Sequence, residues 1–148
     1  MPERSQKDAK DWVARAIAFY KTSEREAALA EFSNPRGTFV QDDMYIFVLN
    51  NKGVMISHGA DEKYIGQDFI DLEDSTGKKF IREIIDTSNT KGNGWVDYIW
   101  YNPATREGER KRAYFEKLGD LIFCCGVYKD IWNGPPWVKA LLRNPLPV

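Results

Sequence analysis

Residues 44–58 read MYIFVLNNKGVMISH, and much of the fold can be predicted outward from them. Two apolar runs, residues 44–49 and 54–58, flank the tetrapeptide Asn50-Asn51-Lys52-Gly53. Asn and Gly are favoured in tight hairpin turns because they tolerate a positive φ. The stretch therefore predicts a β-hairpin.

The segment before the hairpin has the pattern of a helix. Residues 5–33 contain neither Gly nor Pro, and Trp12, Ala16 and Phe19 recur at helical spacing between polar positions. This pattern predicts one long amphipathic helix over about residues 5–33. Asn34-Pro35-Arg36-Gly37 ends it, because Pro disfavours helix in the residue before it.

Downstream of the hairpin, Phe80, Ile81, Ile84 and Ile85 at helical spacing predict a second, shorter helix that begins just after Asp74. Asp74 is expected to cap this helix, with Asp71 and Glu73 solvated beside it. The alternative is that these three carboxylates accept an amine ligand.

Three more strands are predicted, at residues 95–101, 111–118 and 121–128. Consecutive strands with short turns form antiparallel sheets, so the order of elements predicts an α+β fold with about five strands. We expect a single domain over residues 1–148, with its sheet core at about residues 43–128 and a Pro-rich tail at 129–148.

The composition narrows the classes of function. With 43% hydrophobic and 14% aromatic residues, the chain can bury a real core. A net charge of -1, from 21 basic and 22 acidic side chains, provides no field that would attract nucleic acid or an anionic membrane. No apolar run is long enough to span a bilayer, and no signal-peptide pattern is visible.

Neither catalysis nor metal binding is expected. Cys124 and Cys125 are adjacent, so on a strand they point to opposite faces and are predicted to be small buried residues without a disulfide. His58 is the single histidine, and no metal-ligand spacing surrounds it. No nucleophile, phosphate-binding or dinucleotide-binding motif is present, so no enzyme activity and no cofactor are predicted.

An ordered set of short motifs over about residues 43–128 resembles the single-module Cache family. The motifs are Tyr45-Ile46-Phe47-Val48, Lys52-Gly53, Ser57-His58, Ile65-Gly66, Asp71-Leu72 with Asp74 and Gly77-Lys78, Gly94-Trp95-Val96 with Tyr98 and Trp100, Asn102-Pro103, Lys111 with Tyr114, and Gly126-Val127-Tyr128. The resemblance implies a PAS-like sheet folded over a small pocket. It also implies a periplasmic or otherwise extracytoplasmic sensing domain in signal transduction or chemotaxis.

The resemblance implies a small organic ligand: a carboxylate, an amino acid or an amine. We expect it to be bound by side chains with apolar bodies and polar tips, together with a cation. The predicted ligand-binding residues are Tyr45, His58, Tyr98, Trp100, Lys111 and Tyr114. Phe47 is interpreted as core, and Tyr128 either closes the pocket or ends the sheet. Of the neighbours Lys111 and Arg112, one faces inward; the family pattern favours Lys111, but the sequence leaves the choice open.

Two other functions stay open. The chain lacks the flanking membrane helices of receptors, so it is either a trimmed sensing region or a stand-alone Cache protein that docks to a larger membrane or periplasmic complex. Trp132 and Trp137 in the tail are then the candidates for protein docking, unless the tail packs back on its own domain. In a third interpretation, side chains fill the pocket and nothing binds.

Overall fold

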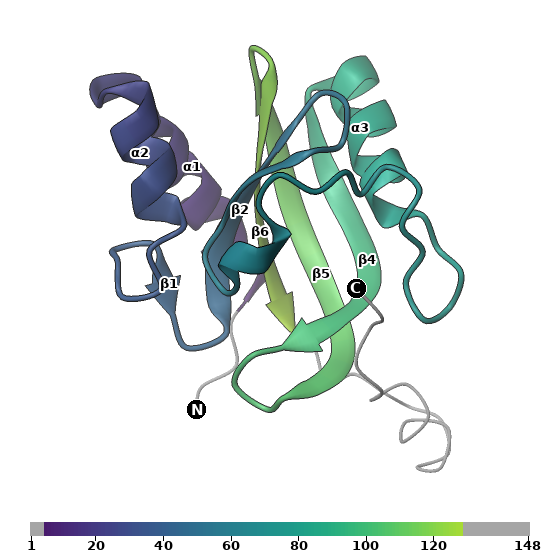
Figure 1. Ribbon diagram of the computed structural model, residues 1–148. Coiled ribbons are helices and arrows are strands. Elements are labelled where there is room, and N and C mark those ends of the chain that lie inside the picture. Colours follow the sequence, from purple (N-terminus) through teal and green to yellow (C-terminus); the bar gives the residue numbers. More distant parts are fainter. Residues whose placement is uncertain (1–4, 129–148) are drawn as a thin grey trace.

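The computed structural model describes residues 5–128, which form one six-stranded antiparallel sheet with helices on both faces (Figure 1). The strands are β1 (Val40–Gln41), β2 (Met44–Asn50), β3 (Met55–His58), β4 (Asn93–Asn102), β5 (Glu107–Leu118) and β6 (Leu121–Tyr128). The spatial order is β1-β2-β6-β5-β4, and β3 also pairs with β2. The predicted α+β class and antiparallel sheet are confirmed; β1, a two-residue strand, is the addition.

The predicted hairpin is formed by β2 and β3. Phe47 lies opposite His58, and Val48 lies opposite Ser57. In the connecting turn Gly53 has a φ of 96° and donates its N–H to the carbonyl of Asn50 at 3.2 Å. Because a side chain is strained at this φ, glycine is the residue that suits the position.

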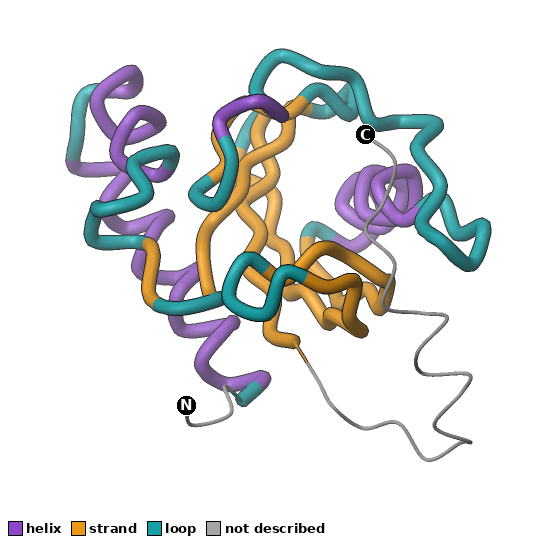
Figure 2. The backbone as a smooth tube through the Cα atoms, turned by 60° about the horizontal axis from the view of Figure 1, so that its bottom comes forward, coloured by secondary structure: helices purple, strands orange, loops and turns teal. Residues whose placement is uncertain are grey.

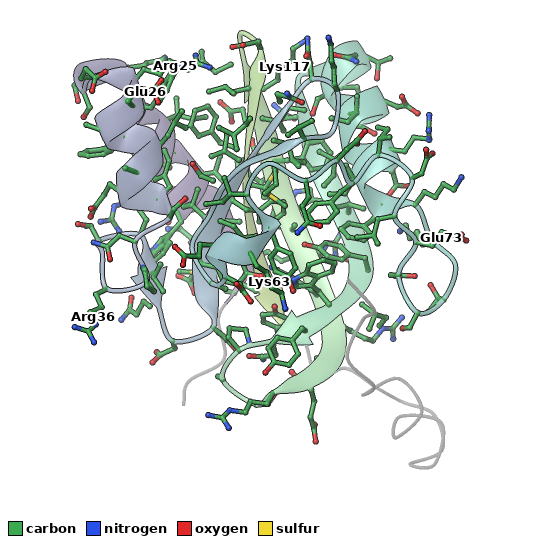
Figure 3. The ribbon with its side chains drawn as sticks, viewed as in Figure 1. Arg25, Glu26, Arg36, Lys63, Glu73 and Lys117 are labelled. Carbon is green, nitrogen blue, oxygen red and sulfur yellow. The ribbon has the colours of Figure 1, made fainter. Side chains whose placement is uncertain are left out.

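The helices are α1 (Gln6–Thr22), α2 (Arg25–Phe32) and α3 (Phe80–Lys91). Helices α1 and α2 cover one face of the sheet and α3 covers the other, as Figure 2 shows. Alternate strand residues therefore enter two separate cores, one on the α3 side and one on the α1/α2 side. Apolar side chains fill both cores, while labelled charged residues such as Arg36 and Glu73 lie at the periphery (Figure 3).

The N-terminal segment is two helices instead of the single helix predicted. Ser23 adopts an extended conformation and ends α1. Glu24 then caps α2, and its carboxylate accepts the N–H groups of Glu26 and Ala27. This local cap offers the backbone an alternative to continuing α1, so the chain turns and both helices lie on the same face of the sheet.

Asp74 has a different role from the helix cap that we predicted. Residue Lys79 precedes α3 and provides no side-chain cap. The Asp74 carboxylate instead accepts N–H groups from Thr76 and Lys78 in its own loop, at 2.9 and 3.0 Å, and from Ile99 of β4 at 2.9 Å. Helix α3 begins at Phe80 and not just after Asp74, so the carboxylate is too far from the helix to cap it. Asp74 ties the loop to the sheet instead.

The loop over residues 74–78 thereby covers the free edge of β4. Besides the bond from Ile99, the Lys78 ammonium donates to the backbone carbonyl of Asp97 at 2.6 Å. Unpaired N–H and C=O groups on an edge strand are sites for unwanted strand pairing, and these two bonds satisfy one group of each kind. Asp71, by contrast, is exposed and pairs with Arg82 at 2.6 Å.

Within residues 5–128 no helix is both long and apolar enough to cross a membrane. Cys124 and Cys125 are buried free thiols in the two different cores, as the alternation of a strand requires.

Candidate ligand-binding site

Strand register collects the candidate polar residues on the α3 side of the sheet. Tyr98 of β4 lies opposite Lys111 of β5, which lies opposite Tyr128 of β6. Beyond β6, Tyr45 of the neighbouring strand β2 projects into the same core, and His58 of β3 packs against the Tyr45 ring. Five strands thus supply one group of side chains, although these residues are far apart in the sequence.

Lys111 lies at the centre of this group and is 2% exposed. Its Nζ donates to the hydroxyl of Tyr45 at 2.8 Å and lies 4.1 Å from the centroid of the Tyr45 ring. The ring centroids of Tyr128 and Phe47 are 5.1 and 5.2 Å away. Among residues 5–128 no carboxylate forms an ion pair with Lys111, and burial lowers its pKa to about 7.

The stem of Lys111 occupies the space that a side chain at Gly126 would need. A Cβ placed on Gly126 would lie 2.3 Å from Cε of Lys111 and 2.9 Å from Cγ. Gly126 does not have the positive φ that favours glycine. Glycine is needed at this position because a side chain would occupy the space of the Lys111 stem. Gly126 therefore sets where the ammonium group can lie.

Two tyrosines continue the hydrogen bonding from Lys111. The hydroxyl of Tyr128 donates to the backbone carbonyl of Tyr101 at 2.6 Å, so it can accept from the Tyr45 hydroxyl 3.4 Å away. Burial raises the pKa of both hydroxyls, so they stay protonated at neutral pH. Each group in this series then donates a hydrogen bond to the next: Lys111 to Tyr45, Tyr45 to Tyr128, and Tyr128 to the carbonyl of Tyr101.

His58 is 2% exposed, and two backbone bonds fix its orientation. Its Nδ1 accepts the N–H groups of Ala60 and Asp61 at 3.2 and 3.1 Å. The proton of the neutral ring is therefore on Nε2, which has no hydrogen-bond partner among residues 5–128. Burial, and then the charge of Lys111, hold the pKa of His58 well below its ordinary value.

Lys111, Tyr45 and His58 line a cavity of about 10 Å³. Its remaining walls are apolar and come from Phe47, Met55, Phe69, Phe80, Ile81 and the aromatic rings of Tyr98 and Trp100. A volume of roughly 10–15 Å³ holds one water molecule, so the space is an aromatic cage that is almost filled by its own side chains. A larger ligand can enter only if some of these side chains move.

Five of the six predicted ligand-binding residues line this cavity or its hydrogen-bond chain, and Tyr114 does not. Tyr114 lies on the α1/α2 side, where its hydroxyl donates to the carboxylate of Glu116 at 2.7 Å and its ring packs on Trp95. The reason is the alternation of the strand: Lys111 and Tyr114 are three positions apart, so they must face opposite sides.

The same alternation answers which of the two neighbouring cations faces inward. Lys111 points into the cage, whereas Arg112 points to the other face, with its guanidinium 5.4 Å from the centroid of Trp95. Its Nε lies 3.5 Å from the Asp97 carboxylate. Phe47, which we interpreted as core, packs beside Lys111 and also lines the cavity.

Several lining residues had not been assigned to the site. Met55, Phe80 and Ile81 fit the apolar pattern of a predicted strand and helix, which does not separate a lining residue from a core residue. Phe69 lies between predicted elements, where no pattern selects it. Trp132 and Trp137 lie outside the described residues. Within residues 5–128 no group of His, Cys, Asp and Glu side chains could hold a metal ion.

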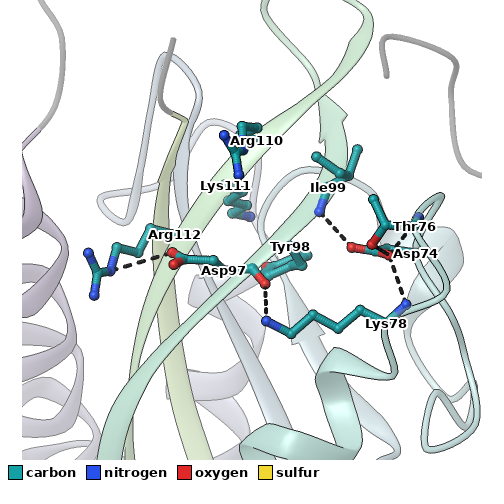
Figure 4. A pocket seen from close by; sticks show the side chains of 9 residues that line it. All are labelled: Asp74, Thr76, Lys78, Asp97, Tyr98, Ile99, Arg110, Lys111 and Arg112. Carbon is teal, nitrogen blue, oxygen red and sulfur yellow. Dashed lines mark hydrogen bonds and ion pairs between the residues drawn. The ribbon is translucent and has the colours of Figure 1, made fainter. Parts of the chain in front are cut away.

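A wider hollow of about 270 Å³ opens at the edge of β4 (Figure 4). Three of the charged side chains around it are engaged with the backbone or with one another: Asp74 with its loop, Lys78 with the Asp97 carbonyl and Arg112 with the Asp97 carboxylate. Arg110 and Lys111 also line this hollow. It is less enclosed by apolar side chains than the cage, and its two carboxylates, Asp74 and Asp97, already have partners. We therefore place the candidate site in the cage.

Comparisons with known proteins agree with this fold. A family model, single Cache domain 2, matches residues 2–137. The crystal structure of a methyl-accepting chemotaxis protein from Vibrio parahaemolyticus is 23% identical, with a TM-score of 0.73 over 84% of this chain and 88% of that one. A Cache chemosensory domain whose structure is described as the basis for carboxylic acid recognition is 26% identical, with a TM-score of 0.65 over 84% and 88% of the two chains.

A curated relative is the sensor histidine kinase MctS of Rhizobium johnstonii. It is 32% identical over 90 residues, which are 60% of this chain and 19% of the kinase. The chain thus matches about a fifth of that protein's length. The family match, which spans nearly the whole sequence, is the broader finding: this chain belongs to the single Cache domain 2 family of sensor domains.

Proposed function

We propose that this domain is an extracytoplasmic sensing domain whose cage binds a short monocarboxylate for signal transduction or chemotaxis. The observation that carries the proposal is Lys111, a buried amine that has no ion-pair partner among residues 5–128. A buried cation needs a counter-charge, and an anionic ligand would supply one.

The polar groups of the cage favour an acceptor as ligand. Besides Lys111, three residues that line the cavity carry further donors: His58, with its proton on Nε2, Tyr98 and Trp100. Among residues 5–128 none of the last three donors has a hydrogen-bond partner. A carboxylate has two oxygens that accept such bonds, and bonds to a charged group are the stronger kind. An amine ligand would instead place a second cation beside Lys111.

The walls favour one carboxylate on a small apolar body. Lys111 is the only cation that lines the cavity within the described residues, and the other walls are aromatic or aliphatic. A second carboxylate would be buried without a partner, which costs free energy. We therefore expect two- and three-carbon monocarboxylates to bind better than dicarboxylates or amines. The related Cache domain described for carboxylic acid recognition supports a carboxylate as the class of ligand.

The test is a thermal-shift and calorimetric comparison of these ligand classes. Wild-type protein and Lys111→Met are titrated with acetate, propionate, succinate, glycine and ethylamine. Lys117→Met is the matched control, because Lys117 is a half-buried β5 lysine that does not line the cage and is bonded to Asn89. A ligand at a hundred times its Kd stabilises the folded state by about 2.7 kcal/mol, which is several degrees in Tm.

We expect monocarboxylates to stabilise the wild type and Lys117→Met but not Lys111→Met. Unchanged binding to Lys111→Met would remove Lys111 from the site. No shift with any carboxylate, in a folded sample, would contradict the proposed ligand.

A second candidate is a Cache-fold accessory subunit that docks to a larger membrane or periplasmic complex. The small volume of the cavity favours it, because a filled cage needs no ligand. Trp132 and Trp137 are its proposed contact residues. If no small molecule binds, co-purification of the full chain with and without Trp132→Ala and Trp137→Ala tests this candidate: loss of a specific partner supports it, and unchanged partners contradict it.

A further inference from the structure

We infer that the cage takes up its carboxylate together with a proton, so that the species it senses is in effect the undissociated acid. The inference rests on the proposed function, because it concerns how the same site meets the charge of its ligand. Its basis is the geometry around Lys111.

Within residues 5–128 no carboxylate forms a hydrogen bond or an ion pair with Lys111. Asp74 and Asp97 share the wider hollow with it, but they are engaged with backbone N–H groups and with Arg112. β2, β4 and β6 present the hydroxyls of Tyr45, Tyr98 and Tyr128, and β6 also presents the Cys124 thiol. Burial raises the pKa of each of these four groups, so all are neutral near pH 7. From β3 comes the neutral ring of His58.

The remaining neighbours of Lys111 do not add a negative charge in contact with its ammonium group. Helix α3 contributes Phe80 and Ile81 to the cavity, and the loop before it contributes Phe69. Cys125, on the other face of β6, is a buried neutral thiol. Asp43 acts on Lys111 only through its longer-range field, and its carboxylate accepts a bond from Asn102 at 3.2 Å.

An ammonium in this place is poorly satisfied. It has three N–H donors, but within residues 5–128 the Tyr45 hydroxyl is its one hydrogen-bond acceptor. The surrounding rings attract a cation, though less than an anion would. Lys111 therefore loses its proton far more easily than an ordinary lysine, in agreement with its pKa of about 7.

A carboxylate in the cage would reverse that preference. Its charge lies beside Nζ and favours the ammonium, so the pKa of Lys111 rises in the complex. Above the pKa that Lys111 has in the ligand-free domain, each binding event must then take a proton from solution. The apparent Kd for the anion is expected to increase toward tenfold per pH unit above about pH 7 and to level off below about pH 6.

His58 is not the group that takes this proton. Its Nδ1 already accepts two backbone N–H groups, so protonation would break both bonds. Its Nε2 already carries a proton. The proton taken up on binding therefore goes to Nζ of Lys111.

The experiment is calorimetry of propionate binding at pH 6, 7 and 8.5, each in two buffers of different ionisation enthalpy. The difference between buffers gives the number of protons taken up. We expect a number near zero at pH 6, about one half near pH 7 and close to one at pH 8.5, with the affinity falling in parallel. Uptake below about 0.2 at pH 8.5 with unchanged affinity would overturn the inference and leave the proposed function standing.

Two variants identify the proton's destination. His58→Gln keeps an acceptor for the two backbone N–H groups, and its proton uptake should match the wild type. If it binds propionate without proton uptake at pH 8.5, His58 is the acceptor and the assignment to Lys111 is wrong. Lys117→Met should behave as the wild type. If propionate binds at no pH, the proposed function fails, and this inference fails with it.

Discussion

At the scale of single residues, the space left by Gly126 decides where a charge can lie. Its backbone would accept alanine without strain, but the added methyl group would collide with the Lys111 stem at 2.3 Å from Cε. Lys111 would then have to leave the Tyr45 hydroxyl. The added methyl group is expected to affect ligand binding more than folding. The flexible Lys111 stem can move aside, but its ammonium group then leaves the position that binding requires.

We therefore expect Gly126→Ala to weaken carboxylate binding at least tenfold, with a loss of about 1–3 kcal/mol in the free energy of unfolding from overpacking. Calorimetry and urea unfolding measure the two effects. Gly94→Ala is the matched control, because its methyl group would press on Phe115 and Thr87 at 3.0 Å and not on Lys111. Equal binding by Gly126→Ala and the wild type would show that Gly126 does not position the amine.

At the scale of elements, the loop at residues 74–78 stabilises the edge strand β4. Burial pushes the pKa of Asp74 up, but the hydrogen bonds from Thr76, Ile99 and Lys78 outweigh this and keep that pKa below its ordinary value. The folded state thus gains stability from the charged carboxylate above about pH 4, and this contribution is lost as the pH falls through the lowered pKa.

Asp74→Ala should lower the free energy of unfolding by about 2–4 kcal/mol at pH 7, since several N–H groups lose their acceptor at once. Hydrogen exchange at the Ile99 amide should become faster. Asp71→Ala should change stability by less than about 1 kcal/mol, because that carboxylate is exposed. If the two variants lose the same stability, the edge bonds do not hold β4 in the way described.

At the scale of the whole molecule, buried bases set the pH dependence of folding. The fold lowers the pKa of His58 well below its ordinary value and that of Lys111 to about 7. The unfolded chain therefore binds more protons than the folded one from about pH 5 to 6.5 because of His58, and above pH 7 because of Lys111. Stability must rise with pH across both windows, by up to about 1.4 kcal/mol per pH unit for each proton.

The rise should end near pH 8.5. The fold raises the pKa of Cys124 and Cys125, so above that pH the unfolded chain loses thiol protons that the folded chain keeps. Urea unfolding at pH 5 to 9 measures this profile. Lys111→Met should remove the rise between pH 7 and 8.5 and keep the rise below pH 6.5. A wild-type stability that is flat from pH 7 to 8.5 would contradict a neutral buried Lys111.

The sequence predicted those features that depend on local patterns. The hairpin follows from its turn residues, and the sheet class follows from consecutive apolar runs. Two further patterns in the sequence indicate what the predictions missed. Ser23-Glu24 is a capping pattern inside the predicted helix, where the chain in fact starts a second helix. Lys111 and Tyr114 are an odd number of positions apart on one strand, which places them on opposite faces of the sheet. Phe69 could not be found in this way, because loop packing follows no period.

The near absence of free space in the cage has a consequence for kinetics. A cavity of about 10 Å³ cannot admit a three-carbon acid until side chains such as Phe69 swing away. The closed form must therefore open before, or as, the ligand arrives. The observed rate of complex formation should level off at high ligand concentration, at the rate of opening, and motions of this kind take roughly microseconds to seconds. The domain would then respond to the average acid concentration over that interval and ignore briefer fluctuations.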